Sequence, residues 1–585
     1  MRRVERHRLL ICPGLALLLY LIGLGTPPLW EPDEGRYAEI AREMVVAHDY
    51  VTPHNNFVIY FEKPPLVYWV TAASLRIFGR NEFAARLPAA IASAGQVAVT
   101  YALADAMFGA TTATLAALAL ALSPLFFSFA RFATPDPELA FFLTAALTSF
   151  YRGAQCAGAL NGIDFRWMLA SAVMLALATL TKGPVALLLG GAIALLWLML
   201  QGRGRDGLRI GWLPCVALYL TITLPWFIVI AHGNPGFARF FLIHEHFQRY
   251  LASTEHGWGP WFYIPIIIAG TWPWIYFLPL AFTGFRVRSS LPPSSEKISA
   301  QGASIDNADE RSSLHFLLIW CAVILVFFSI PRSKLGEYIL PVLPPISILA
   351  GRGLARLDQI VAERKRLLLV TFASINTAAA LAMTAAVLMA PAGGLRHALA
   401  GDAAIAAMAL LAGGIAPLLI SDCKADVIAL QLAVSVIVAL VAGNDARRRV
   451  APWVSYRELA KAVAPYAQQG CKLMSFRHFE QALPFYTGAR ETLVDYRGEL
   501  QPFGPLSDAS GNVFATVEQL KNAWTGGHCT VLIANRVDVP MLINVLSPAP
   551  ILIGCEGKKL ALYNRPLDSP SQLPSGCFST ATKNP

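Results

Sequence analysis

The sequence predicts an all-α polytopic membrane domain followed by a small C-terminal α/β domain. Composition is the first reason: hydrophobic residues make up 55% of the 585 residues and charged residues only 14%. Soluble domains carry roughly 25% charged residues, so a soluble fold is excluded. The second reason is that apolar runs of about 20 residues, long enough to cross a bilayer, recur as far as residue 443. The third is the change to short apolar runs between polar segments over 444–585.

We predict about thirteen membrane-spanning helices in a domain that covers residues 1–443. The predicted spans are 9–25, 87–107, 112–130, 138–151, 167–181, 184–200, 211–231, 262–283, 314–330, 338–354, 367–390, 403–420 and 426–443. Between the eighth and ninth spans, the Ser- and Pro-rich composition of 289–313 predicts a flexible loop.

The distribution of Lys and Arg predicts the orientation of these spans. The N-terminus is placed in the cytoplasm by four arginines ahead of the first span: Arg2, Arg3, Arg6 and Arg8. Later basic clusters fall in loops on the same predicted side: 203–209, 286–288 and 352–366. The loop 26–86 and the tail then lie outside. The net charge of +10 reflects this asymmetry, and no nucleic-acid partner is indicated.

The tail, 444–585, predicts an α/β domain because helical and strand patterns alternate. The predicted helices are 456–469 and 517–524, and the predicted strands are 472–476, 531–534, 551–554 and 560–563. Four cysteines lie in this tail, an even number that permits disulfides in an oxidising compartment: Cys471, Cys529, Cys555 and Cys577.

The outer loop 26–86 is too long for a simple connector, and loops of this length are usually functional. From Tyr37, apolar residues recur with a period near 3.6, which predicts an amphipathic helix on the membrane surface. The apolar segment 66–78 is too short to span and predicts a second interfacial helix. The loop therefore predicts a lid that carries charged residues to head-group depth.

Acidic residues in this loop are the first candidates for chemistry, since charges held at a membrane face are functional candidates by default. Asp33, with Glu34 beside it, is the prime candidate for a catalytic carboxylate. Asp136, in Thr134-Pro135-Asp136-Pro137-Glu138, is a second acid on the same predicted face. The alternative is that both aspartates only cap helices, because Asp is favoured at that position and Pro137 suits the first helical turn.

Cations on the same face are candidates for binding a phosphate. Lys63 lies between Glu62 and a stiff Pro-Pro pair, where its ammonium would stabilise a phosphate leaving group; the alternative is an ordinary Lys–Glu surface pair. Arg249 suits bidentate phosphate binding and would share a helix face with His246. His246 with Glu62 would make a weak divalent metal site, for Zn or Mg. Lys334, near Tyr338, binds either the substrate or simply lipid phosphates.

Five motifs make a specific resemblance in order and spacing: DEGRYAEIAREM, YFEKPPLVYW, TPDPE, HEHFQRY and KLGEYILP. With them the chain resembles the ArnT-like lipid A aminoarabinose transferases of glycosyltransferase family 83. These belong to the GT-C superfamily, together with the protein O-mannosyltransferases. By motif, the resemblance implies that Asp33 and Asp136 are the essential acids. It also implies that Tyr60, Glu62 and Lys63 line the carrier-phosphate pocket.

The resemblance implies a monomeric enzyme of the bacterial inner membrane with a periplasmic active site and tail. Its donor would be a sugar on undecaprenyl phosphate, its acceptor lipid A or lipopolysaccharide, and its reaction inverting, with no cofactor required. The alternative enzyme transfers galacturonic acid or mannose to lipopolysaccharide or protein. The non-enzyme alternative is a lipid flippase or transporter, which would place ionisable residues near the bilayer midplane rather than at one face.

Overall fold

The computed structural model describes residues 3–155, 164–203, 212–248, 257–283, 297–389, 394–419, 424–496, 498–500 and 513–566. The contacts between residues divide the chain into two compact units. The membrane unit comprises Met1–Ile22, Ala89–Ala386 and Ala403–Gly443. The loop–tail unit comprises Gly23–Pro88, Val387–Asp402 and Asn444–Pro585, so the outer loop groups with the tail.

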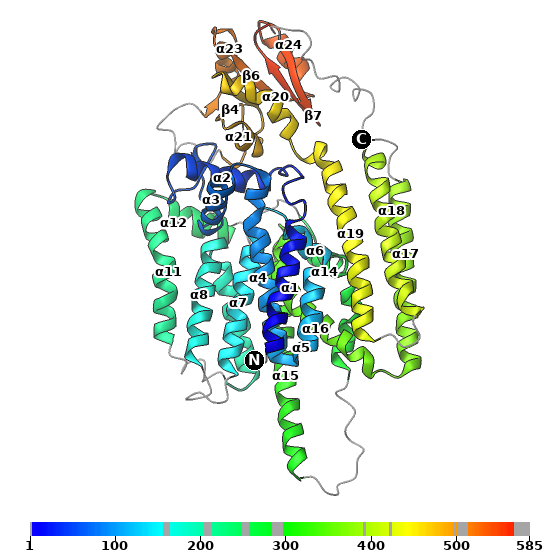
Figure 1. The fold of residues 1–585 in the computed structure, drawn as a ribbon. Coiled ribbons are helices and arrows are strands. Elements are labelled where there is room, and N and C mark those ends of the chain that lie inside the picture. The colour runs from blue at the N-terminus through cyan, green and yellow to red at the C-terminus, as the bar shows by residue number, and fades with distance from the viewer. Residues whose placement is uncertain are drawn as a thin grey trace. The chain divides into compact units, whose positions relative to one another are not determined.

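A helix coincides with every predicted span (Figure 1). These helices are α1 (Arg3–Leu21), α4 (Glu82–Phe108), α5 (Ala110–Ala121), α6 (Pro124–Phe129), α7 (Asp136–Ala154), α8 (Phe165–Lys182), α9 (Val185–Leu200), α11 (Trp212–Gly233), α14 (Tyr263–Thr271), η4 (Trp274–Phe282), α15 (Lys297–Ser329), η5 (Gly336–Val342), α16 (Leu343–Ala355), α17 (Ala362–Met389), α18 (Gly394–Ile415) and α19 (Ala425–Val454). Shorter helical segments are α12 (Phe237–Arg239), η2 (Phe240–Gln248), η3 (Pro260–Phe262), η6 (Arg356–Gln359) and η7 (Ala416–Leu418).

Within the described residues, eight helices are long and apolar enough to span a membrane. The number is nine if α14 and η4, which meet at 104°, form one broken span. Several other predicted spans are shorter or broken helices, such as α5 followed by α6, so the count of thirteen stays a prediction. The predicted loop 289–313 is wrong in its second half, because α15 already begins at Lys297.

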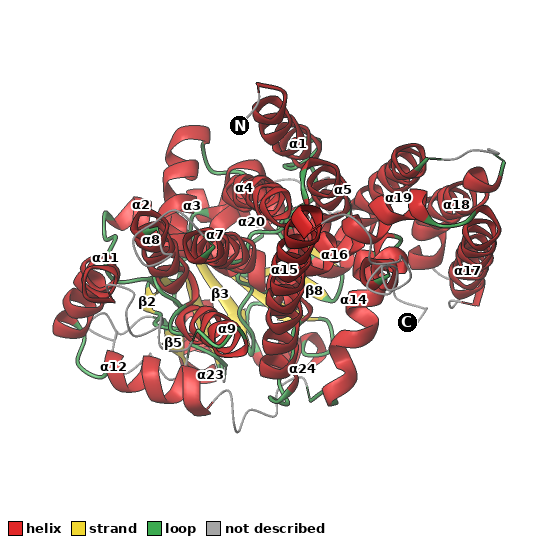
Figure 2. Ribbon diagram, turned by 90° about the horizontal axis from the view of Figure 1, so that it is seen from below, coloured by secondary structure: helices red, strands yellow, loops and turns green. Residues whose placement is uncertain are grey.

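The helices of the membrane unit pack through small residues. Helices α7, α8 and α9 contact one another and are seen end-on as a group in Figure 2. Helix α16 contacts both α5 and η4. A Cβ atom at Gly353 of α16 would lie 1.9 Å from the Phe277 carbonyl oxygen, so only glycine permits this approach.

The tail folds as predicted around a sheet with helices on both faces, in the loop–tail unit. The strands are β3 (Lys472–Phe476), β4 (Glu491–Val494), β5 (Phe514–Ala515), β6 (Thr530–Asn535), β7 (Ile551–Glu556) and β8 (Lys559–Tyr563). Their order is β5-β4-β3-β6-β8-β7, parallel from β5 to β6 and antiparallel beyond. The helices are α20 (Arg457–Gln468), α21 (Ala482–Thr487), α23 (Val517–Thr525) and α24 (Val539–Val545).

Alternation along the strands creates the two cores of this sheet. On one face Leu473 and Val531 pack with Leu459 of α20. On the other face Met474 packs with Trp524 of α23. A disulfide joins Cys471 to Cys529 just ahead of β3 and β6, which confirms that the tail cysteines can pair.

The loop part of this unit contains both predicted interfacial helices, α2 (Asp33–Ala47) and α3 (Leu66–Phe78), joined through a hairpin of β1 (His54–Asn55) and β2 (Val58–Ile59). Helix α2 is buried from Glu34 to Met44, polar residues included. The charged residues that lie off the apolar face of α2, Glu39, Arg42 and Glu43, are therefore covered as well. Gly35 permits the close contact with α21, since a Cβ there would lie 2.5 Å from the Ala482 nitrogen.

Candidate functional site

The centre of the charged cluster in the loop–tail unit is Arg36, one turn into α2. Its guanidinium lies 3.6 Å from a carboxylate oxygen of Asp33, 3.9 Å from Glu62 and 3.3 Å from Glu499 of the tail. Burial alone would lower the pKa of Arg36, but Tyr60 and the three carboxylates around it raise that pKa well above its usual range. One permanent cation thus gathers three carboxylates from the start of α2, the YFEKP motif and the tail.

The two candidate aspartates do not act as helix caps. Helix α2 begins at Asp33 with Pro32 in the capping position, and α7 begins at Asp136 with Pro135 there. Neither start has a side-chain capping hydrogen bond among the described residues. Both carboxylates instead contact cations, so the capping alternative loses its support.

Glu34 is fully buried and has a different environment from Asp33. Its two oxygens accept hydrogen bonds from Arg86, at 2.6 and 2.7 Å, and a third from Arg447 at 3.0 Å. The backbone N–H of Trp30 donates another at 3.0 Å. A buried carboxylate shared between one fully buried and one partly buried arginine is typical of a structural ion pair that anchors a helix. A catalytic role for Glu34 has no support in this geometry.

The YFEKP motif places its residues around the same cluster. Tyr60 is fully buried, and burial raises the pKa of its phenol well above the usual value. The Glu62 side chain is 12% exposed and contacts Arg36. The Lys63 ammonium donates to the Glu62 backbone carbonyl at 3.2 Å. The phosphate-binding role of Lys63 and the ordinary Lys–Glu pair both stay predictions.

A second acid–cation group lies in the membrane unit. The Asp136 carboxylate, 5% exposed, accepts a hydrogen bond from Lys182 at the end of α8. The Lys182 ammonium also lies 4.2 Å from the centre of the Tyr338 ring. An ammonium over a ring face is attracted by its quadrupole, so the aromatic ring and the carboxylate hold the cation together. Three segments distant in sequence meet at this point.

The remaining predicted site residues are Lys334, Arg249 and His246, and the structure describes the side chain of Lys334 among them. Lys334 is buried, and its ammonium donates to the backbone carbonyls of Trp258, at 3.1 Å, and Pro331. Arg249 and the side chain of His246 lie outside the described residues. In the part of the chain that the structure describes, no group of three or more His, Cys, Asp or Glu side chains is placed to hold a metal ion. The metal pair of Glu62 and His246 stays a prediction.

The loop is fixed to the tail by polar contacts inside the loop–tail unit. Glu31 accepts hydrogen bonds from the N–H groups of Gln481 and Ala482, at 3.0 and 2.7 Å, at the start of α21. Burial and neighbouring Glu480 raise the pKa of Glu31 well above its usual value. Asn56 exchanges two hydrogen bonds with the backbone of Glu491. These contacts hold α2 against the domain that supplies Glu499.

Three residues that contact the candidate site residues were not identified as functional from the sequence. The sequence does contain a local indication for Arg36, because it lies three residues after Asp33 on one helix. Lys182 had only its predicted position on the same membrane face. Glu499 had no signal, since its contact with Arg36 joins segments more than 460 residues apart in the chain.

Family models match two parts of the chain. Residues 62–229 match the family described as dolichyl-phosphate-mannose-protein mannosyltransferase. Residues 459–551 match the aminoarabinose transferase C-terminal domain. The first match lies mostly in the membrane unit and the second in the tail.

Curated relatives carry the name undecaprenyl phosphate-alpha-4-amino-4-deoxy-L-arabinose arabinosyl transferase. A protein of this name, with the suffix 2, from Pseudomonas fluorescens is 30% identical over 61% of this chain. One from Erwinia tasmaniensis is 35% identical over 57% of this chain. The aligned regions span 61% and 56% of these relatives' own lengths, less than two thirds of either.

A solved structure matches along almost the whole chain. ArnT from Cupriavidus metallidurans bound to undecaprenyl phosphate superposes with a TM-score of 0.81 at 28% identity, covering 95% of this chain and 98% of that one. Its apo state superposes with a TM-score of 0.80. The match thus takes in both the membrane helices and the tail domain. The chain is therefore similar to ArnT in sequence and structure along almost its whole length.

Proposed function

We propose that this chain is a glycosyltransferase that moves 4-amino-4-deoxy-L-arabinose from undecaprenyl phosphate to lipid A, with inversion at the anomeric carbon. The observation that carries the proposal is the near full-length match to an ArnT with undecaprenyl phosphate bound. The names of the curated relatives support the sugar and its carrier. The lipid A acceptor follows from the resemblance of the five sequence motifs.

The reaction that we propose is a single displacement. An acceptor oxygen forms a bond to the anomeric carbon while the bond from that carbon to the phosphate oxygen of the carrier breaks. Undecaprenyl phosphate leaves with the electron pair and gains negative charge. A nearby cation that offsets this charge lowers the barrier, and Lys63 is the residue that we assign to this role.

We assign Asp33 to the reacting sugar or acceptor because its side chain is the more accessible acid of the loop. It is 34% exposed, whereas the Glu62 side chain is 12% exposed and that of Glu34 is fully buried. Arg36, 3.6 Å away, orients the Asp33 carboxylate. With a phosphate acceptor, Asp33 would orient the substrate and stabilise oxocarbenium charge; with a hydroxyl acceptor it would be the general base.

We assign Asp136 to holding Lys182 in place. A carboxylate that keeps an ammonium oriented is a positioning residue, and Lys182 would then contact an anionic group of the donor or acceptor. The site would face the periplasm of a bacterial inner membrane, as the distribution of Lys and Arg predicts.

Transfer with purified components tests this proposal. The protein is reconstituted in vesicles with undecaprenyl-phosphate-linked aminoarabinose and lipid A, and the product is identified by mass spectrometry. We expect aminoarabinosyl lipid A and free undecaprenyl phosphate in equal amounts. Transfer from a galacturonic acid or mannose donor, with none from the aminoarabinose donor, would contradict the proposed sugar.

A further inference from the structure

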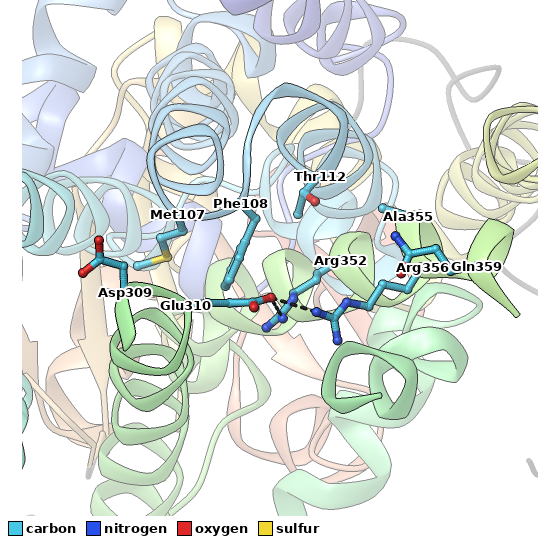
Figure 3. Close-up of a pocket in the computed structure, with 9 residues that line it drawn as sticks. All are labelled: Met107, Phe108, Thr112, Asp309, Glu310, Arg352, Ala355, Arg356 and Gln359. Atoms are coloured by element: carbon cyan, nitrogen blue, oxygen red, sulfur yellow. Dashed lines mark hydrogen bonds and ion pairs between the residues drawn. The ribbon is translucent and has the colours of Figure 1, made fainter. Parts of the chain in front are cut away.

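A cavity of about 570 Å³ opens in the membrane unit where the end of α4, the start of α5 and the end of α16 meet the middle of α15 (Figure 3). Its volume lies within the roughly 300–1,000 Å³ that small-molecule pockets occupy. It takes no part in the function proposed above. The residues that line it are Met107, Phe108, Thr112, Asp309, Glu310, Arg352, Ala355, Arg356 and Gln359.

Two arginines and two carboxylates line this cavity, but the arginines contact one of the carboxylates together. Glu310 of α15 accepts hydrogen bonds from both Arg352 and Arg356, the latter at 2.8 Å. Figure 3 shows the two guanidinium groups converging on this one carboxylate, while Asp309 points away from them. An anionic group that enters beside Glu310 would meet these two guanidinium groups.

Arg352 has an unused donor inside the protein. Its side chain is only 3% exposed, and its guanidinium carbon lies 4.5 Å from the centre of the Phe108 ring. Its Nη1 atom has no hydrogen-bond partner among the described residues. A buried charged donor without an acceptor is more costly than a neutral one. An arginine also presents a planar fork that suits two phosphate oxygens.

The sequence assigns this end of the membrane unit to the cytoplasmic leaflet. Arg352 and Arg356 begin the basic stretch 352–366, which is the strongest of the predicted cytoplasmic clusters. Anionic lipids attract such segments, and basic pockets between membrane helices on this side bind phosphate head groups. Met107 and Phe108 supply an apolar wall beside the two arginines.

We propose that this cavity binds the phosphate of an anionic phospholipid from the cytoplasmic leaflet, with Arg352 and Arg356 as its donors. Glu310 then competes with the lipid for the same two guanidinium groups. A purely structural trio, in which Glu310 only ties α15 to α16 and η6, would bind no lipid. The two accounts differ in what removal of Glu310 does.

The test is native mass spectrometry of the full-length protein, delipidated and titrated with phosphatidylglycerol or with phosphatidylcholine. We expect phosphatidylglycerol to bind preferentially. The Arg352→Gln and Arg356→Gln variants should each weaken this binding about tenfold or more, which is the loss of one charge-assisted contact. Arg364→Gln, which removes an exposed charge from the same basic stretch, should leave it unchanged.

Two further variants separate lipid binding from a structural role. Glu310→Gln should tighten phosphatidylglycerol binding, because the competing carboxylate is gone. Arg352→Lys keeps the charge without the fork and should bind at an intermediate level, which covers the case in which Arg352→Gln does not fold.

Three outcomes would overturn the proposal. The first is equal binding of phosphatidylglycerol and phosphatidylcholine by the natural protein. The second is weaker lipid binding in Glu310→Gln. The third is binding of inorganic phosphate at the arginines with no preference for the anionic lipid, which would assign the site to a soluble anion.

Discussion

At the scale of single residues, Asp33 and Glu34 have different surroundings although they are neighbours in the sequence, because a helix turns about 100° per residue. Asp33 points toward Arg36 and remains about one third exposed, whereas Glu34 points inward to Arg86 and Arg447. One acid is therefore accessible, and the other is enclosed in a buried ion pair. The sequence alone places both acids among the candidates, with Asp33 first.

Replacement of Asp33 by Asn should abolish sugar transfer while leaving expression and membrane insertion intact. The amide has the shape of the carboxylate but neither its charge nor its basicity. Turnover of the reconstituted protein measures the effect. We expect a loss of at least about 100-fold, the low end of what a positioned acid–base group contributes.

The matched control for Asp33 is Asp49→Asn. Asp49 belongs to the same loop and accepts hydrogen bonds from the nearby N–H groups of Val51 and Thr52. The Asp49→Asn variant should transfer sugar at the rate of the natural protein. Near-normal sugar transfer by both the Asp33→Asn and the Asp136→Asn variant would remove both aspartates from the mechanism.

Lys63→Ala should slow transfer mainly by weakening donor binding, since the ammonium is assigned to the carrier phosphate. Lys63→Arg should recover only part of the activity, because a planar fork replaces a compact charge. Donor titration of the reconstituted protein separates affinity from rate, with the exposed Lys461→Ala as control. Unchanged donor affinity and rate in Lys63→Ala would refute the assignment.

At the scale of elements, helix α2 is held by contacts that periodicity does not reveal. The periodic pattern correctly predicts a helix because helix formation is local. It also separates the charged residues from the apolar face, but it does not reveal that α3, the hairpin and the tail cover them. Glu39 pairs with Arg42, and Glu43 accepts the Phe57 N–H. Sequence patterns cannot identify partners that tertiary packing brings from afar.

Glu34→Ala should therefore destabilise the loop–tail unit. It leaves Arg86 buried without its anion, and removal of one partner from a buried pair typically costs about 3–5 kcal/mol. Thermal unfolding in detergent measures the effect. Glu458→Ala, which breaks a largely exposed pair with Lys461, should cost about 1 kcal/mol or less. Equal losses in the two variants would mean that Glu34 does not anchor α2.

The tail sheet should lose stability as the pH rises from about 4.5 to about 7. Burial raises the pKa of Glu556, at the end of β7, from 4.5 to about 7. Between these values the folded state keeps a proton that the unfolded state has released, so stability falls as pH rises. The protonated Glu556 contributes on the order of 3 kcal/mol to the free energy of unfolding. This contribution is fully present below about pH 4.5 and is lost by about pH 7.

Hydrogen exchange of the β7 and β8 amides, corrected for intrinsic rates, measures this dependence. Glu556→Gln resembles the protonated side chain and should remove it. Glu518→Gln, a change of an exposed glutamate in the same domain, should not. An identical pH dependence in Glu556→Gln and the natural protein would assign the effect to other groups.

At the scale of the whole molecule, the sequence predicts the membrane domain and the α/β tail because apolar length and alternation are local properties. It also predicts Asp33, Asp136 and the YFEKP residues as site residues, because unusual charges at a membrane face are informative. It does not identify Arg36, Glu499 or Lys182 as partners. Those contacts depend on packing between segments remote in the chain, such as Asp136 of α7 with Lys182 of α8.

The central claim is that this chain decorates lipid A with aminoarabinose, and the direct measurement is mass spectrometry of lipid A. Lipid A from cells with and without the gene is compared, with complementation by the natural chain and by Asp33→Asn. We predict a pentosamine increment of about 131 Da on the lipid A phosphates. The increment should disappear with the gene and return only with the natural chain. A hexuronic increment, or unchanged lipid A together with glycosylated exported proteins, would contradict the account.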